Sequence, residues 1–139
     1  MQSNTTGKNA TRRRILDAAT AVFSEKGYHG AAVDDIVKVS NTSKGSFYFH
    51  FPSKESLFLT VMERLGSRLV TRVKRDLIAV HDPMERLDVA LETTIRTLCR
   101  HRTLAKLLLV KGYSMGPAFA GKRQEIFSGF AGLTEQLID

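Results

Sequence analysis

Hydrophobic positions recur every three or four residues along most of the chain, the spacing that places them on one face of an α-helix. The first such run ends at Gly27, a residue type that commonly follows the last helical turn, and comprises Ile15, Ala18, Ala19, Val22 and Phe23. The polar residues 1–10 before it predict a flexible tail. No segment alternates between apolar and polar residues as a half-buried strand does, so the sequence predicts an all-α fold.

A compact helix-turn-helix is expected between residues 33 and 52. Its first helix begins near Val33, with acidic residues that complement the positive end of the helix dipole. Asn41 tolerates a left-handed turn conformation, and Ser43 can cap the following helix. Pro52 ends that helix because proline disfavours helical geometry in the residue before it.

The helix expected at residues 43–51 has two chemically different sides. Phe47 and Phe51 are expected to anchor one side in a core. The other side can donate hydrogen bonds to phosphates or base edges from Lys44, Ser46, Tyr48 and His50. This distribution suits a helix that lies in the major groove of DNA.

The second half of the chain predicts further helices. A long one runs from Ser53 to about Val80, and another starts at Asp82-Pro83 with a buried stripe expected at Met84, Leu87, Leu91, Ile95 and Leu98. A last helix opens at Gly116-Pro117. The predicted domains are residues 1–52, a tail with a helix-turn-helix DNA-binding domain, and residues 53–139, a helical domain in which the sequence stops within an apparently helical stretch.

Composition adds a preference for anionic partners. The 139 residues are 42% hydrophobic and 25% charged, and 21 Lys and Arg against 14 Asp and Glu give a net charge of +7, as in a soluble globular nucleic-acid-binding protein. Cys99 is the only cysteine, so no intramolecular disulfide can form. We expect it to be a small buried residue in a cytoplasmic protein. No apolar run approaches the roughly 20 residues of a membrane helix.

With these residues in view, the N-terminal part resembles the TetR (tetracycline-repressor-like, TetR/AcrR) family of bacterial transcription regulators. The resemblance covers about residues 11–60. It rests on residues 15–19, Phe23, Gly27-Tyr28, residues 33–36, the stretch from Ser43 to Phe51, and residues 53–57. It implies a homeodomain-like three-helix unit that a long helix joins to a helical regulatory domain for ligand binding and dimerisation, residues 53–139. Because relatives normally carry two more long helices, the resemblance also implies that this domain is incomplete.

The resemblance also implies partners and site residues. Such regulators bind palindromic double-stranded operators as homodimers, and a small-molecule effector usually releases them. Here the DNA-binding residues would be Arg12, Arg13, Arg14, Ser43, Lys44, Gly45, Ser46, Tyr48, Phe49, His50 and Lys54. Four of them, Lys44, Gly45, Ser46 and Tyr48, would face bases and nearby phosphates. His50 and Lys54 would hold the DNA backbone, and the three arginines would approach phosphates from the start of the first helix.

Several positions differ from the family's usual pattern. The turn Ser40-Asn41-Thr42 is more polar than usual, and Ala32 lacks the hydroxyl that commonly caps the second helix. Asp34 stands where some relatives have a basic residue, so we expect this helix to contribute little to base recognition. Phe49 replaces a common tyrosine, which leaves one fewer hydroxyl for phosphate.

Two function classes stay open besides an effector-released repressor. One is a DNA-associated adaptor whose helical body binds or inhibits a protein partner. An enzyme is disfavoured because the sequence shows no glycine-rich phosphate loop, no metal cluster and no nucleophile with a matching base. No cofactor or metal is expected, since His29, His81 and His101 lack partners at metal-ligand spacing. The sequence indicates neither the operator nor the effector-binding residues.

Overall fold

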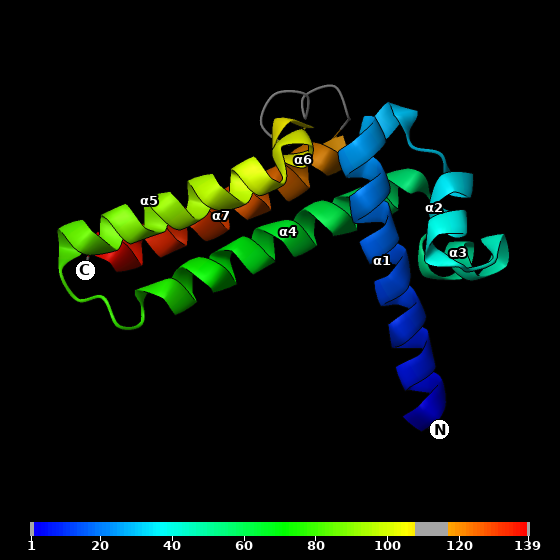
Figure 1. Ribbon diagram of the computed structural model, residues 1–139, viewed down its shortest axis with the longest axis horizontal. Coiled ribbons are helices and arrows are strands. Elements are labelled where there is room, and N and C mark those ends of the chain that lie inside the picture. The colour runs from blue at the N-terminus through cyan, green and yellow to red at the C-terminus, as the bar shows by residue number, and fades with distance from the viewer. Residues whose placement is uncertain (1, 108–116, 139) are drawn as a thin grey trace. The chain divides into compact units, whose positions relative to one another are not determined.

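A computed structural model describes residues 2–107 and 117–138, and every regular element among them is a helix (Figure 1). The all-α prediction is confirmed. The helices are α1 Gln2–Gly30, α2 Val33–Ser40, α3 Lys44–His50, α4 Lys54–Leu77, α5 Pro83–Arg100, α6 Arg102–Lys106 and α7 Pro117–Ile138. The chain forms two compact units, Met1–Val61 and Met62–Asp139, which divide within α4. The first unit therefore contains α1 to α3 and the first two turns of α4.

Helix α1 is longer than the sequence predicts. The expectation of a flexible tail is wrong for residues 2–10, which form the first turns of α1. No proline interrupts this segment, and each residue added to an existing helix gains one backbone hydrogen bond. The predicted end at Gly27 is a break, with φ 74° and ψ −179°, after which helical residues continue to Gly30.

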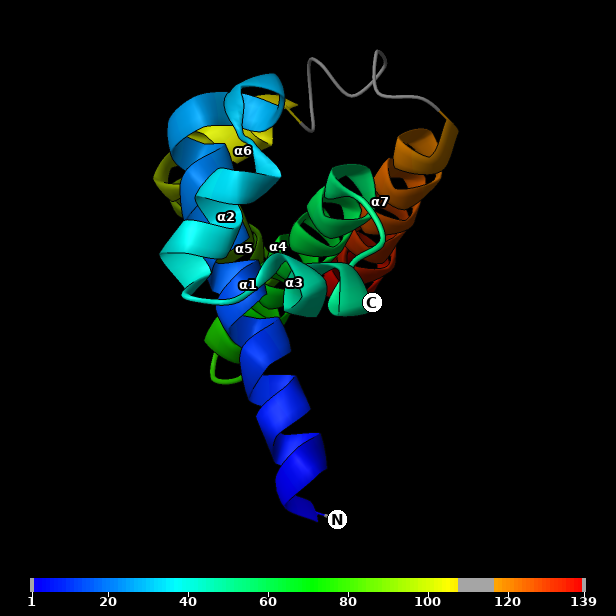
Figure 2. The ribbon, with the colours of Figure 1, turned by 90° about the vertical axis from the view of Figure 1, so that its right-hand side faces the viewer.

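The core of the first unit lies where α1, α2, α3 and the start of α4 meet (Figure 2). Phe47 and Phe51 are 0% and 1% exposed, which confirms that the phenylalanine side of α3 faces inward. Phe23 of α1 and Phe58 of α4 pack edge to face, with ring centres 5.0 Å apart. Ile15, Ala19, Ile36, Leu57 and Val61 complete the buried centre. This packing fixes α3 by one side only and leaves its other side at the surface.

The second unit is held by α4 and α5. Leu69, Val73 and Leu77 of α4 pack against Ala90, with Val89 beside them. The Thr93 hydroxyl donates to Asp76 Oδ2 at 2.8 Å and adds a polar tie between the helices. As the sequence predicts, Pro83 opens α5, and the Asp82 carboxylate caps it by accepting from the Glu85 amide at 3.0 Å.

The predicted buried stripe of α5 is wrong. Met84, Leu87, Leu91 and Ile95 are 68%, 42%, 52% and 58% exposed, and Leu98 is half-buried. Helix α5 instead buries Ala90 and Thr93. Apolar periodicity identifies residues that share a face, but a partner must cover that face before it is buried. Cys99 is exposed as well, contrary to expectation.

Candidate DNA interface

The turn between α2 and α3 is closed by its own polar groups. Asn41 adopts the predicted left-handed conformation, with φ 54°. The Thr42 amide donates to the Val37 carbonyl at 3.1 Å, and the hydroxyls of Ser40 and Thr42 lie 2.8 Å apart. The polar turn that departs from the family pattern is therefore internally hydrogen-bonded, which fixes the direction in which α3 leaves it.

Helix α3 has the boundaries that its local sequence predicts. Ser43 Oγ accepts from the Ser46 amide at 3.0 Å, and the Phe51 amide donates to the Phe47 carbonyl at 2.9 Å. At Gly45 the only atom near a hypothetical Cβ is Ser43 Oγ, at 3.9 Å. Folding therefore does not require glycine there. Its bare backbone leaves room for another molecule to approach α3 closely.

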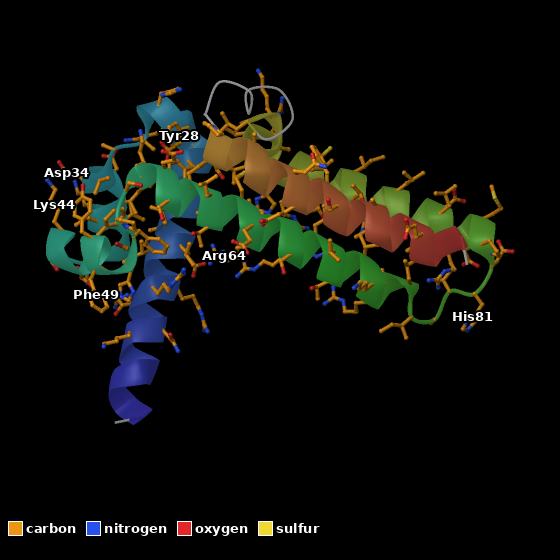
Figure 3. The ribbon with its side chains drawn as sticks, turned by 180° about the vertical axis from the view of Figure 1, so that it is seen from behind. Tyr28, Asp34, Lys44, Phe49, Arg64 and His81 are labelled. Atoms are coloured by element: carbon orange, nitrogen blue, oxygen red, sulfur yellow. The ribbon has the colours of Figure 1, made fainter. Side chains whose placement is uncertain are left out.

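The outward face of α3 combines a cation with exposed aromatic rings. Lys44, Gly45, Tyr48 and Phe49 are exposed, with Tyr48 at 49% and Phe49 at 69%, and Ser46 and His50 are half-buried. Figure 3 shows Lys44 and Phe49 at the surface of this unit. The Phe49 ring buries little of its surface in the fold and suits contact with another molecule.

Basic residues of α1 extend this face beyond α3. The Arg12 guanidinium lies 4.7 Å from the centre of the Phe51 ring, and the Lys8 ammonium lies 5.4 Å from the centre of the Phe49 ring. Partial burial, and then the charges of Arg12 and Lys8, hold the pKa of His50 below its ordinary value. Helix α1 therefore places positive charge beside the carboxyl end of α3.

Sequence reasoning missed Lys8 because it treated residues 1–10 as a tail. In a helix, Lys8 and Arg12 are four residues apart and share a face, a signal that the sequence contains. Arg13 and Arg14 are exposed on α1. The expectation that the three arginines stand at the start of the first helix is wrong, because α1 begins at Gln2. The positive end of the α1 dipole therefore does not assist them.

Lys54 has partners within the first unit. Its ammonium donates to the carbonyls of Tyr28, at 2.9 Å, and Ala31, at 3.1 Å, and lies 4.4 Å from the centre of the Tyr28 ring. Burial, and then the charge of Glu55, raises the pKa of the Tyr28 hydroxyl. Lys54 therefore ties the start of α4 to the connection between α1 and α2. An ammonium has three donors, so one stays available for a phosphate.

The two acidic residues at the start of α2 have different partners. Asp35 accepts from the Ala32 amide at 3.2 Å and pairs with Lys26 at 3.3 Å; these two interactions, in that order, lower its pKa. This carboxylate satisfies the Ala32 amide at the start of α2, where Ala32 itself makes no side-chain capping hydrogen bond. Asp34 pairs across the turn with Lys44 at 2.9 Å, and that contact raises the pKa of Lys44.

A three-helix unit that buries one side of a short third helix and presents a basic, aromatic face on the other is the architecture of a helix-turn-helix DNA-binding protein. The sequence model of the family described as bacterial regulatory proteins, tetR family, matches residues 15–61. A solved transcriptional regulator (TerR/AcrR family) from Aquifex aeolicus VF5 is 30% identical, with a TM-score of 0.69 over 92% of this chain and 71% of that one. The chain belongs to the tetR family of bacterial regulatory proteins.

Other similar proteins are also named as regulators. The Bacillus subtilis HTH-type regulator YvdT, itself uncharacterised, is 35% identical over 77% of this chain and 54% of its own length. The fatty acid degradation regulator FadR from Bacillus halodurans is 25% identical, with a TM-score of 0.77 over 91% of this chain and 68% of that one. The chain spans about half the length of the curated relatives it matches, 54% of YvdT and 42% of the activator FasR from Mycolicibacterium smegmatis.

Neither a metal cluster nor a membrane-spanning helix occurs in the part of the chain that the structure describes. Among residues 2–107 and 117–138, no three His, Cys, Asp or Glu side chains are grouped so that they could hold a metal ion. Within the same part of the chain, no helix combines the length and the apolar character that crossing a membrane requires.

Proposed function

We propose that this protein is a sequence-specific DNA-binding transcription regulator, with residues 1–52 binding DNA and residues 53–139 contributing the regulatory part. The main support for this proposal is that α3 has one buried and one exposed side. Phe47 is fully buried, whereas Lys44, Tyr48 and Phe49 are exposed. Helix α3 would lie in the major groove. Regulators of this family are bacterial, so we place it in the cytoplasm, at the nucleoid.

The side chains of this face would divide the work of recognition. Tyr48 and Ser46, near the middle of α3, would contact base edges, and the bare backbone of Gly45 would let α3 enter the groove. Lys44 and the α1 cations Lys8 and Arg12 would neutralise phosphates, and His50 would donate a hydrogen bond to one. Phosphate contacts fix register and much of the affinity, whereas a few groove contacts set sequence preference. Of the predicted set, Arg13, Arg14, Ser43, Phe49 and Lys54 would lie at the edges of this contact.

The regulatory part of the proposal is a repressor that binds a palindromic operator as a homodimer and is released by a small molecule. An open groove of about 420 Å³ between α4 and α7 falls in the size range of ligand sites. Its lining combines Gly66, Ser67, Thr71 and Gly129 with the apolar Val70 and with the charged residues Glu63, Lys74 and Glu125. A small polar molecule would fit this lining. The similar protein FasR is named an activator, so the alternative to repression is that this protein activates transcription.

The test begins by selecting bound sequences from fragmented bacterial genomic DNA. Fluorescence anisotropy then compares the selected duplex with a mixed-sequence duplex of equal length. We expect Tyr48→Ala to reduce the ratio of the two affinities by about fivefold or more, as loss of one groove contact does. His81→Ala, at an exposed position of the second unit, is the control. An unchanged ratio for Tyr48→Ala would show that the assigned face does not recognise sequence.

The exposed apolar residues of α5 favour one second candidate, a DNA-associated adaptor. Met84, Leu87, Leu91 and Ile95 form a stripe that would suit a protein partner. Affinity capture from a bacterial lysate with and without nuclease separates the two functions. A stoichiometric protein partner that survives nuclease treatment would favour the adaptor, whereas capture of DNA fragments alone would favour the regulator.

A further inference from the structure

One ion pair crosses the helix-turn-helix at its surface. The Lys44 ammonium, at the start of α3, lies 2.9 Å from Asp34 Oδ1 in the first turn of α2. The two side chains are 62% and 74% exposed, and Figure 3 shows them next to one another. Lys44 is also the cation that α3 presents first toward DNA in the proposed function, on which this inference rests.

We propose that Asp34 is an internal counter-ion that holds Lys44 in the free protein and competes with DNA phosphate for it. Asp34 then limits DNA affinity without touching DNA. When Lys44 contacts a phosphate, the pair is broken and the carboxylate loses its cation while it stands beside the same phosphate. Binding therefore carries two electrostatic costs, the lost ion pair and the repulsion between two anions.

The surroundings of Asp34 support a role in binding over one in folding. Its neighbour Asp35 already caps α2 through the Ala32 amide and pairs with Lys26. Asp34 has the weaker structural contact, since an exposed pair contributes little to folding. An exposed pair is also easily exchanged, and a phosphate is a strong competitor for an ammonium group. Removing the charge of Asp34 should therefore change DNA binding while the unit stays folded.

The experiment is a double-mutant cycle on the full chain, read by fluorescence anisotropy on a labelled mixed-sequence duplex of about 30 base pairs at about 50 to 300 mM salt. We expect Asp34→Asn to tighten binding. The gain should be about two- to fivefold larger in the presence of Lys44 than in a Lys44→Met background, because only the first includes release of the ion pair. The difference should shrink as salt rises.

Glu25→Gln is the matched control, since Glu25 is an exposed acid of α1 in the same unit and its loss changes net charge equally. The gain in DNA affinity from Asp34→Asn should be larger than the gain from Glu25→Gln. If Asp34→Asn gains the same factor in both Lys44 backgrounds, Asp34 acts only through general charge and the proposal is overturned. Absence of binding to any duplex by the unaltered chain would instead contradict the proposed function. Circular dichroism of each variant confirms that all are folded.

Discussion

Substitution of Lys54 distinguishes most clearly between a structural role and a DNA-binding role. The resemblance to the family assigns it to the DNA backbone, whereas the structure gives its ammonium two carbonyl acceptors and an aromatic ring. Lys54→Met keeps most of the aliphatic chain and removes the charge. We expect it to destabilise the first unit in the absence of DNA, because the Ala31 carbonyl would lose this partner.

The magnitude follows from the three contacts. A hydrogen bond to a charged group contributes about 1.5–3 kcal/mol, and a half-buried lysine keeps only the lower part of that range. The Tyr28 carbonyl also accepts from the Ala31 amide, at 3.4 Å, so it is not left unsatisfied. The contact with the Tyr28 ring adds about 0.5–1 kcal/mol. We therefore expect Lys54→Met to lower the free energy of unfolding by about 2 kcal/mol.

Urea unfolding followed by far-ultraviolet circular dichroism measures this loss, and hydrogen exchange of the amides near Gly30 localises it. Lys44→Met is the control, because its partner Asp34 is exposed and such pairs contribute about 0.2–1 kcal/mol. Lys44→Met should weaken DNA binding with little change in stability. If the free energy of unfolding of Lys54→Met lies within about 0.5 kcal/mol of that of the unaltered chain, the contacts of Lys54 with the two carbonyls do not stabilise the unit and the reasoning is refuted.

Two further predictions test the core and the pH dependence. Phe47→Ala should lower the free energy of unfolding by about 3–5 kcal/mol, whereas Phe49→Ala on the exposed face should change it by about 0.5 kcal/mol or less; equal losses in urea unfolding would contradict the assigned faces. The pKa of His50 is lowered, so the unfolded chain binds its proton more readily. The stability that this group contributes is therefore complete above about pH 6.5 and is lost as pH falls through the lowered pKa. A nearby phosphate would raise that pKa, so DNA affinity should rise as pH falls below about 6.5. His50→Gln should flatten this dependence of DNA affinity on pH in anisotropy titrations. An unchanged dependence would show that His50 does not contact a phosphate.

The helix-turn-helix could be predicted closely because its signals are local. Ser43 caps α3 by accepting from an amide three residues later, and Pro52 follows the last capping residue, Phe51. The buried sides of Phe47 and Phe51 follow from helical periodicity within the same short segment. Each of these features depends on residues within about one turn of one another, which is the range over which sequence constrains backbone geometry most directly.

The interactions that modify the candidate interface could not be predicted in this way. The acceptors of Lys54 lie 26 and 23 residues earlier in the chain, and only the packing of α4 against α1 brings them together. The pair of Asp34 and Lys44 depends on the angle at which the turn around Asn41 joins α2 to α3. On α5, periodicity correctly grouped the apolar residues, but burial depends on a covering partner that sequence spacing does not specify.

Lys44 and Lys54 show why a motif transfers positions more reliably than roles. Both match the family pattern, and both carry the same charge. Lys44 is paired with an exposed carboxylate, an interaction that water and salt weaken and that a phosphate can replace. Lys54 donates to the backbone carbonyls of Tyr28 and Ala31, so moving its ammonium toward DNA would cost the Ala31 carbonyl this partner. The same side chain is therefore available for DNA at the start of α3 and largely committed to the fold at the start of α4.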